Sequence, residues 1–292
     1  MTFTRLRHAS VLGWITKFWE QYTTYRAGVV GLSIVLLFTV LAVFGPMIAP
    51  YDPFELSPEV LVPPSTTHFF GTDHLGRDVF SRVIWGTQIS FIFGFLAAGI
   101  SLVIGIVLGA LPGYYGGWID DVFNRAIEVF LTIPTLILVI LVVAMFSTDI
   151  VFAITVVGLT LWPSNAKITR AQVLSLKARE YVLACKGAGG GDLRLLFMHI
   201  VPNGMYPIIA NSFVQMAYAI LTEASLSFLG LGDLKRVSWG LMIYDAQTHV
   251  LTSGWLAVYP GIAITMLVVG LNLVGDAINF VLNPKMKIRE TS

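Results

Sequence analysis

A long stretch without a charged side chain, from Val83 to Ile119, limits the fold of this chain more than any other feature of the sequence. A second charge-free run extends from Ala27 to Tyr51. About 20 apolar residues in an α-helix are enough to cross the hydrocarbon core of a bilayer. A soluble domain carries roughly 25% charged residues, whereas only 12% of these residues are charged and 56% are hydrophobic. The sequence therefore predicts an all-α polytopic membrane protein.

Six transmembrane helices are expected, because charged and turn-forming residues divide the apolar sequence into six runs. The expected spans are residues 28–50, 88–112, 129–148, 150–166, 204–229 and 260–282. We expect a kink in the third span at Pro134, a break in the fourth at Pro163, and the sixth to begin at Pro260. Residues 88–284 then form a five-helix core, to which the first span adds one helix.

Residues 51–87 are predicted to form an extracytoplasmic loop with a surface helix, in which Asp78 and Arg82 would be i, i+4 partners. Four side chains of this loop are of types that bind metals in other proteins: His68, Asp73, His74 and Asp78. Their spacing matches no defined metal site. A helix on the membrane surface explains the charges equally well, and no metal site is predicted.

Most of the positive charge lies on one side of this topology. Of the 18 Lys and Arg residues, Arg77, Arg82, Lys235 and Arg236 fall on one side, and the other fourteen fall on the side that holds both termini. Cytoplasmic loops carry an excess of Lys and Arg, so both termini are predicted to be cytoplasmic. Residues 285–292 then form a cytoplasmic tail. Residues 1–27 form a cytoplasmic amphipathic segment whose aromatic residues Trp14, Phe18 and Tyr22 recur every four positions.

Small residues recur every four positions in the second predicted span, at Ser101, Gly105, Gly109 and Gly113. Small side chains at this interval let two helices approach closely in lipid. This face of the span is therefore expected to pack against a neighbouring helix.

The segment 174–203 is the one long charged interruption in the second half of the chain. Its first part has apolar residues at helical spacing: Leu174, Ala178, Tyr181, Cys185 and Ala188. The glycine run 189–191 should end this helix, and Asp192 is placed to cap a second one. The second helix carries Leu193, Leu196, Phe197 and Ile200 on one face. The apolar faces of these two helices could pack on the chain's own spans or fill a groove on a separate protein.

Polar residues also form stripes within the last two predicted spans. In the fifth span, Asn211, Gln215 and Glu223 are separated by multiples of four residues, and in the sixth Asn272 and Asp276 are four residues apart. Polar groups that face lipid are costly, so each stripe should face protein or a water-filled path. A translocation path and hydrogen bonding between helices both remain open.

The segment 174–203 resembles the signature loop of the permease subunits of ATP-driven (ABC) importers, in which Glu-Ala-Ala is followed by Gly and then by Ile-x-Leu-Pro. Ala184, Gly189 and Pro202 stand at the first Ala, the Gly and the Pro of that motif. This chain departs from the motif at four positions: Leu183 for Glu, Cys185 for the second Ala, His199 for Ile and Val201 for Leu. The ending His-Ile-Val-Pro-Asn is similar to the variant found in dipeptide, oligopeptide and nickel importers. Residues 71–82, 223–232 and 272–276 resemble further motifs of the same family.

The resemblance implies that the segment 174–203 couples this chain to a separate ATPase. The residues implied in this coupling are Glu180, Leu183, Ala184, Cys185, Gly187, Gly189, Leu193, Phe197 and Pro202. The implied partners are a homologous permease subunit, two cytoplasmic ABC ATPase subunits and an extracytoplasmic solute-binding protein, within the lipid of the inner or plasma membrane. No cofactor is expected in this chain, since ATP and Mg would bind to the ATPase subunits, and no nucleic acid is expected to bind. Di- or oligopeptides are the leading substrate, with oligosaccharides and nickel as alternatives within the family.

The remaining motifs do not indicate an enzyme. The glycine-rich run 187–191 is followed by no Gly-Lys-Ser/Thr and preceded by no strand, as a phosphate-binding loop would require. Acidic residues within the spans are scattered over both ends rather than paired at one depth. The alternative from a different class is a secondary transporter driven by an ion gradient through Glu223 and Asp276. Transport in vesicles that lack nucleotide would distinguish it from an ATP-driven importer.

Overall fold

The structure, a computed structural model, describes residues 11–282, and almost all of its regular structure is helical. The principal helices are α1 (Val11–Thr24), α2 (Arg26–Ile48), α3 (Val79–Tyr115), α4 (Gly117–Thr132), α5 (Thr135–Phe146), α6 (Ile150–Leu176), α10 (Met205–Phe228), α11 (Trp239–Ala246) and α12 (Trp255–Leu282). Between α6 and α10 lie four short pieces: α7 (Glu180–Gly187), α8 (Asp192–Leu195), the π-helix η1 (Leu196–Ile200) and α9 (Val201–Asn203). The predicted tail 285–292 and the first ten residues lie outside the described part.

Four helices, α2, α3, α6 and α12, are long and apolar enough to cross a membrane. The pair α4 and α5 makes a fifth span if it is counted as one element, and its two parts meet at an angle of 79°. Helix α10 has 24 residues and runs between the same two ends of the molecule, but it does not reach the same apolarity. The prediction of a multi-helix membrane protein is confirmed, whereas the count of six spans is not.

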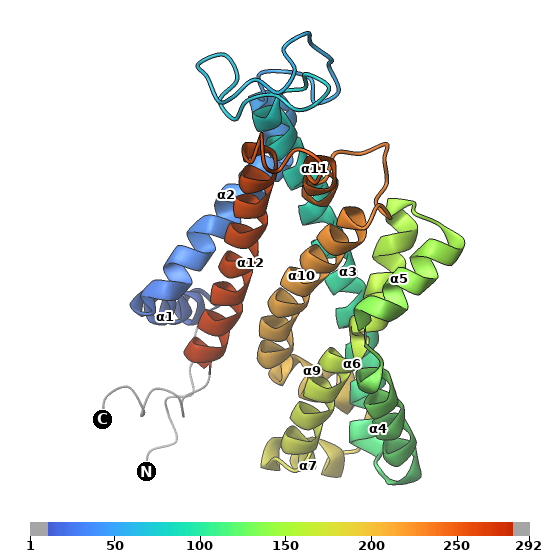
Figure 1. Ribbon diagram of the computed structural model, residues 1–292. Helices are drawn as coiled ribbons and strands as arrows, with labels where there is room; N and C mark the ends of the chain where they lie inside the picture. The colour runs from blue at the N-terminus through green and yellow to red at the C-terminus, as the bar shows by residue number, and fades with distance from the viewer. Residues whose placement is uncertain (1–10, 283–292) are drawn as a thin grey trace.

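The molecule has two ends, which Figure 1 shows at the top and the bottom. One end, called the loop end here, holds the loop 49–78 and α11. The other, the α7 end, holds α7 together with the start of α4. Helix α3 runs from one end to the other without interruption.

Close packing of α3 against α6 places the small residues of α3 where the sequence predicted a helix contact. A side chain at Gly105 would overlap Asn165, and one at Gly109 would overlap the carbonyl oxygen of Ala166. The Asn165 amide also donates a hydrogen bond of 3.0 Å to the Ser101 hydroxyl. The predicted helix-packing role of this stripe is therefore confirmed.

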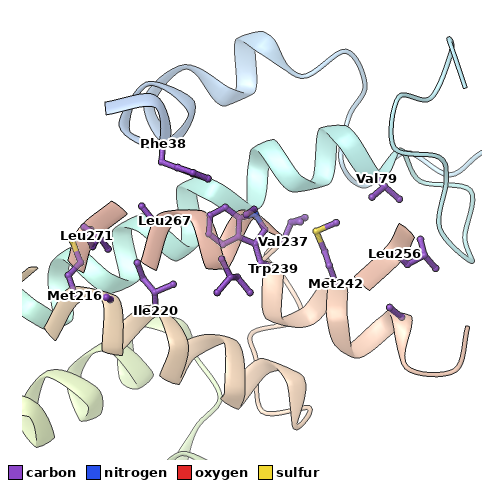
Figure 2. Close-up of a cluster of buried hydrophobic side chains, with 14 of the residues drawn as sticks. Phe38, Val79, Met216, Ile220, Val237, Trp239, Met242, Leu256, Leu267 and Leu271 are labelled. Atoms are coloured by element: carbon purple, nitrogen blue, oxygen red, sulfur yellow. The ribbon is translucent and has the colours of Figure 1, made fainter. Parts of the chain in front are cut away.

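Trp239 at the start of α11 lies at the centre of the largest hydrophobic cluster, which Figure 2 shows. Its ring is fully buried, contacts Phe38 of α2 edge-on at 5.7 Å between ring centres, and leaves no room for a side chain at Gly86 of α3. The indole Nε1 donates to the Val83 carbonyl oxygen at 2.9 Å. Helix α11 is thus held between α2, α3 and α12 rather than lying free on the surface.

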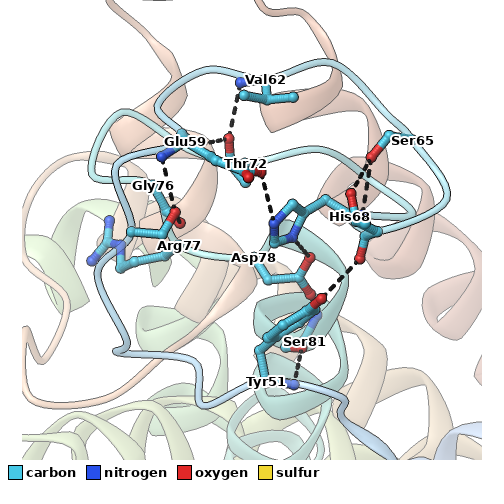
Figure 3. A network of polar contacts seen from close by, with 12 residues as sticks. Tyr51, Glu59, Val62, Ser65, His68, Thr72, Gly76, Arg77, Asp78 and Ser81 are labelled. Carbon is cyan, nitrogen blue, oxygen red and sulfur yellow. Dashed lines mark hydrogen bonds and ion pairs between the residues drawn. The ribbon is translucent and has the colours of Figure 1, made fainter.

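The loop at the loop end is ordered by polar contacts, several of which appear in Figure 3. The His68 ring bonds to the Asp78 carboxylate at 2.8 Å, and Asp78 accepts from the Ser81 backbone N–H as the N-cap of α3. Arg82 lies near Asp73 and Asp245 instead of pairing with Asp78. The predicted i, i+4 pair is therefore wrong, because Asp78 caps the helix and its carboxylate is already occupied.

Several predicted helix boundaries are corrected. The predicted surface helix within residues 51–87 is absent as a separate element, since α3 begins at Val79 and continues into the second span. Helix α6 passes through Pro163 to Leu176, and α12 begins at Trp255 with Pro260 inside it. Proline is tolerated within membrane helices because neighbouring groups satisfy the carbonyl that it leaves free. At Pro134 the expected kink is a full break between α4 and α5.

Helix α1 confirms that the amino-terminal segment is helical from residue 11 onwards. Tyr22 is buried against Ala277 and Val281 of α12, and its hydroxyl donates to the Gly28 carbonyl oxygen at 2.9 Å. At least part of the predicted aromatic face therefore packs on the protein itself.

Candidate functional site

The segment between α6 and α10, called the coupling segment here, consists of two short helical parts joined by a glycine turn. Its first helix is shorter than predicted, because α6 continues to Leu176 and α7 starts only at Glu180. Leu174 therefore belongs to α6 and not to the predicted apolar row of the first helix. The second part, residues 192–203, combines α8, η1 and α9.

One face of the coupling segment packs on the chain's own spans. Val182 of α7 and Leu196 and Ile200 of η1 are buried in a cluster with Ala110 of α3 and Val173 of α6. The prediction that these helices fold back on their own spans is thus true of this face.

The opposite face exposes large apolar side chains. The exposed fractions are 56% for Leu183, 57% for Leu193, 65% for Met198, 41% for Tyr181 and 38% for Phe197. Within the described residues nothing covers them, although this end of the molecule would meet water rather than lipid in the predicted topology. A row of apolar side chains exposed to water is typical of a surface that docks on another protein.

The predicted apolar row of the second helix is divided between the two faces. Leu196 and Ile200 are buried, whereas Leu193 and Phe197 are exposed. Each pair is spaced i, i+4, so the predicted face consists of two adjacent rows, of which one packs on the protein and the other is exposed. Neither Tyr181 nor Met198 was singled out as a docking residue, and their exposure could not be read from helical spacing alone.

The other residues assigned to coupling lie on the exposed side or at its edges. Glu180 is in the first turn of α7, Ala184 and Gly187 are exposed, Cys185 is half-buried, and Pro202 is exposed in α9. The structure thus brings the predicted coupling residues into one continuous segment at the α7 end.

Polar contacts fix the coupling segment to the end of α3. The Tyr114 hydroxyl donates to the Asp192 carboxylate at 2.6 Å, and Lys186 lies 3.7 Å from the same carboxylate. The Lys177 ammonium group donates to the Gly113 carbonyl oxygen at 2.8 Å. Asp192 was predicted to cap the second helix, but Gly191 is the N-cap, and Asp192 uses its side chain to bind α3 instead. Neither Tyr114 nor Lys177 could be found from sequence, since their partners are distant along the chain.

Replacing Tyr114 with Phe should weaken coupling without unfolding the chain. The change removes one hydrogen bond to a partly exposed carboxylate, a loss of about 1 kcal/mol. In the ATP-driven importer that the family resemblance implies, we expect more ATP to be hydrolysed per solute imported, because the coupling segment is held less firmly to α3. The adjacent Tyr115→Phe is the matched control, since that side chain is half exposed. Equal coupling ratios in the two variants would show that the Tyr114 hydroxyl is dispensable.

The glycine turn between the two parts has one position with a strict requirement. Gly189 has a φ of +85°, a conformation that residues with a side chain rarely adopt. Gly191 has a φ of −66° and no neighbouring atom where a side chain would stand. Only the first of these two glycines is therefore demanded by the backbone.

The polar stripe of α10 faces other helices of the same chain. The Asn211 amide donates to Asn165 Oδ1 of α6 at 2.8 Å. Gln215 is buried, and the buried Glu223 carboxylate accepts from Ser227 at 2.7 Å and from Ser90 of α3 at 3.4 Å. These contacts favour hydrogen bonding between helices, and a role in translocation stays a prediction.

The stripe of α12 is less enclosed. The Asn272 amide donates to the Val268 carbonyl oxygen of its own helix at 2.8 Å, and Asp276 is exposed. An exposed carboxylate on a membrane helix requires water or a partner. The structure does not join Asn272 and Asp276 to the stripe of α10 in one site.

No group of three or more His, Cys, Asp or Glu side chains arranged to hold a metal occurs among residues 11–282. His68 is held between Asp78 and Glu59, at 2.8 Å and 3.4 Å, while Asp73 pairs with Arg77. His68, Asp73 and Asp78 are therefore structural partners, whereas His74 stacks on the His249 ring at 5.7 Å and its buried Nδ1 makes no hydrogen bond within the described residues.

Comparison with known proteins agrees with this geometry. Residues 101–288 match the family described as the binding-protein-dependent transport system inner membrane component, and residues 14–64 match the N-terminal TM domain of oligopeptide transport permease C. The chain is 36% identical to a dipeptide transport system permease protein of Haemophilus influenzae, over 94% of this chain and 95% of the relative. It is 38% identical to an oligopeptide transport system permease protein of Bacillus subtilis, over 91% and 88%.

A third relative, a glutathione transport system permease protein of Pectobacterium atrosepticum, is 33% identical over 98% of this chain and 96% of its own length. These matches cover nearly the whole chain, including both the coupling segment and the helices that hold it. The chain therefore belongs to the family of binding-protein-dependent transport system inner membrane components, the membrane-spanning permease subunits of ABC importers.

Proposed function

We propose that this chain is one permease subunit of an ATP-driven importer for dipeptides and oligopeptides. The observation that carries the proposal is the exposed apolar face of the coupling segment, which is held rigidly against α3 and α6 but covered by nothing within the described residues. The relatives named for dipeptide and oligopeptide transport support the choice of substrate. Oligosaccharides, nickel and glutathione are the alternatives to be tested.

The proposed assembly contains a homologous permease subunit, two ABC ATPase subunits and a solute-binding protein. The excess of Lys and Arg on the side of the coupling segment supports a cytoplasmic α7 end and cytoplasmic termini. The loop end then faces the solute-binding protein. ATP and Mg bind in the ATPase subunits, and this chain contributes no catalytic residue.

In the proposed mechanism, closure of the ATPase pair displaces the coupling segment. Helices α6 and α10 flank this segment directly, and Tyr114 and Lys177 join it to α3. Displacement of the segment therefore moves three of the long helices together. Their rearrangement exposes the path first to one side of the membrane and then to the other, with Asn211, Gln215, Glu223, Asn272 and Asp276 as the residues proposed to contact the path.

The function is tested with the complete transporter in vesicles. Uptake of a labelled dipeptide should require ATP, the ATPase subunits and the solute-binding protein, and excess unlabelled peptide should compete where oligosaccharide or nickel does not. Uptake driven by a proton or sodium gradient without nucleotide would instead indicate a secondary transporter. Competition by an oligosaccharide or by nickel alone would leave the permease assignment intact and replace the substrate.

Valine at Gly189 should uncouple ATP hydrolysis from uptake. A β-branched residue at a φ of +85° costs about 1 to 3 kcal/mol, so the turn must change shape and α7 must shift relative to η1. Gly191→Val in the same turn is the matched control, because its backbone is extended and its surroundings are open. The measurement is peptide imported per ATP hydrolysed. Normal coupling in Gly189→Val would contradict the proposed role of the turn.

A further inference from the structure

A groove of about 250 Å³ lies between α2, α3 and α12 near the loop end. Phe38 and Ala263, both buried, line it, and exposed Leu37 of α2 and Ile262 of α12 stand at its edges. Thr87 contributes a hydroxyl, which already donates to the Val83 carbonyl oxygen within α3. The lining is therefore almost wholly apolar.

Glycine contacts explain why the groove exists at this level of the molecule. Near the start of α2, Gly28 and Gly31 touch Ala277 and Leu273 of α12 so closely that no side chain would fit. Near the end of α2, Gly45 makes its close contact with α3 rather than with α12. Helix α2 thus passes from α12 to α3 along its length, and the groove occupies the space between α2 and α12 where their close contact has ended.

An aromatic cluster closes the groove towards the loop end. Phe70 from the loop stacks on Tyr259 of α12 with ring centres 3.8 Å apart, and it meets Phe80 of α3 edge-on at 4.9 Å. All three side chains line the groove. Its end is thus defined by rings that are fixed against one another.

We propose that this groove binds one acyl chain of a membrane lipid. Its apolar lining offers almost no hydrogen-bonding partners to water and therefore suits an apolar ligand. The three helices that form it are all long and apolar enough to span a membrane, and the exposed side chains Leu37, Ile48 and Ile262 at its rim show that it opens outward. An extended hydrocarbon chain therefore has direct access from the bilayer.

A helix of a second protein is the competing occupant, but a helix is too wide to enter the groove. A helix with its side chains is about 10–12 Å across, so it could cover the groove but could not enter it. Beyond Arg26, its first residue and distant from the groove, α2 also offers no charged group with which a protein partner could pair. An acyl chain is narrow enough to enter the groove and needs no charged partner within it.

The groove lies between helices that belong to two different family matches, and this position indicates a role for the lipid. Helix α2 lies in the match for residues 14–64, whereas α12 lies in the match for residues 101–288. The acyl chain would fill the gap where the additional helix meets the core, and it would stabilise that contact.

The test uses the assembled transporter in vesicles of phosphatidylethanolamine and phosphatidylglycerol with a trace of phosphatidylethanolamine that carries a photoreactive acyl chain. After illumination, labelled residues are identified by mass spectrometry. We expect labelling to be concentrated on the groove residues of α2 and α12. It should exceed labelling at Val30 and Val269, which are similarly exposed on these helices but do not line the groove.

Met266→Trp fills the groove from a position that is 39% exposed, and Val269→Trp places the same ring outside it at a position that is 46% exposed. Met266→Trp should lose most of the groove labelling, whereas Val269→Trp should retain it. Leu37→Trp fills the groove from the α2 side and should repeat the loss, which guards against misfolding of one variant. Three results would each overturn the proposal: labelling spread evenly over all exposed faces, labelling unchanged by Met266→Trp, or cross-linking of an Ile262→Cys variant to the homologous subunit.

Discussion

Leu183→Asp should abolish peptide uptake while leaving the chain folded in the membrane. Leu183 is 56% exposed in α7, so the substitution removes little packing within the chain. In the proposed complex this side chain is buried in the ATPase, where an unpaired carboxylate is strongly unfavourable. Loss of a central interface contact of this kind costs about 2 to 4 kcal/mol. Every 1.4 kcal/mol lowers affinity about tenfold, so the ATPase subunits should no longer co-purify.

The measurements are uptake in vesicles and the amount of ATPase retained on the purified permease. Leu251→Asp is the matched control, since Leu251 is 98% exposed between α11 and α12 at the loop end. It should leave the amount of retained ATPase unchanged, because the loop end lies away from α7. Full retention of the ATPase by Leu183→Asp would show that α7 is not the docking helix, and the proposed mechanism would then fail.

Gly109→Val should strongly destabilise the chain. A side chain at this position would overlap the carbonyl oxygen of Ala166, and a backbone group of α6 cannot move aside without separating the two helices. Overpacking of this kind costs about 3 kcal/mol. We expect a lower thermal midpoint in detergent and little protein in the membrane.

Gly99→Val in the same helix separates packing from helix propensity, because a side chain there would meet no atom within 4 Å. Its thermal midpoint should stay close to that of the wild type. If both valine variants unfold at the same temperature, close contact between α3 and α6 is not what the small residues provide.

Local patterns predicted those parts of the fold that depend on local physics. The small-residue stripe identified the face of α3 that packs on α6, and Pro134 identified the break between α4 and α5. Apolar length identified α2 to within two residues at each end. In each case the determining property, side-chain size, ring constraint or hydrophobicity, belongs to the residues themselves.

The parts that were missed depend on partners far away in sequence. Arg82 appeared to need Asp78, four residues before it, but its carboxylate partners include Asp245 in α11. Because that network satisfies the charge, α3 can begin in the polar loop and continue into the apolar span. Charges were taken as boundaries of elements, which shortened the predicted α3 and α6.

In the candidate site, too, local sequence predicted some features, whereas others depend on residues that are distant along the chain. The location of the coupling segment and its glycine turn followed from the sequence pattern. Which apolar residues face outward did not, because Leu193 and Phe197 are as apolar as Leu196 and Ile200, and only packing against α3 and α6 determines which pair is buried. The Tyr114 contact with Asp192 joins two elements whose proximity only the folded chain creates.

Because α3 is one continuous helix, a tilt at one end displaces the other end. With 37 residues it is about 55 Å long, and its two ends are tied to different machinery, through Arg82 to the ionic network around Asp245 and through Tyr114 to the coupling segment. A tilt of only about 10° about one end carries the other through about 10 Å, given that length. In the proposed mechanism, a small change in the angle of α3 at the α7 end would therefore produce a large displacement at the loop end.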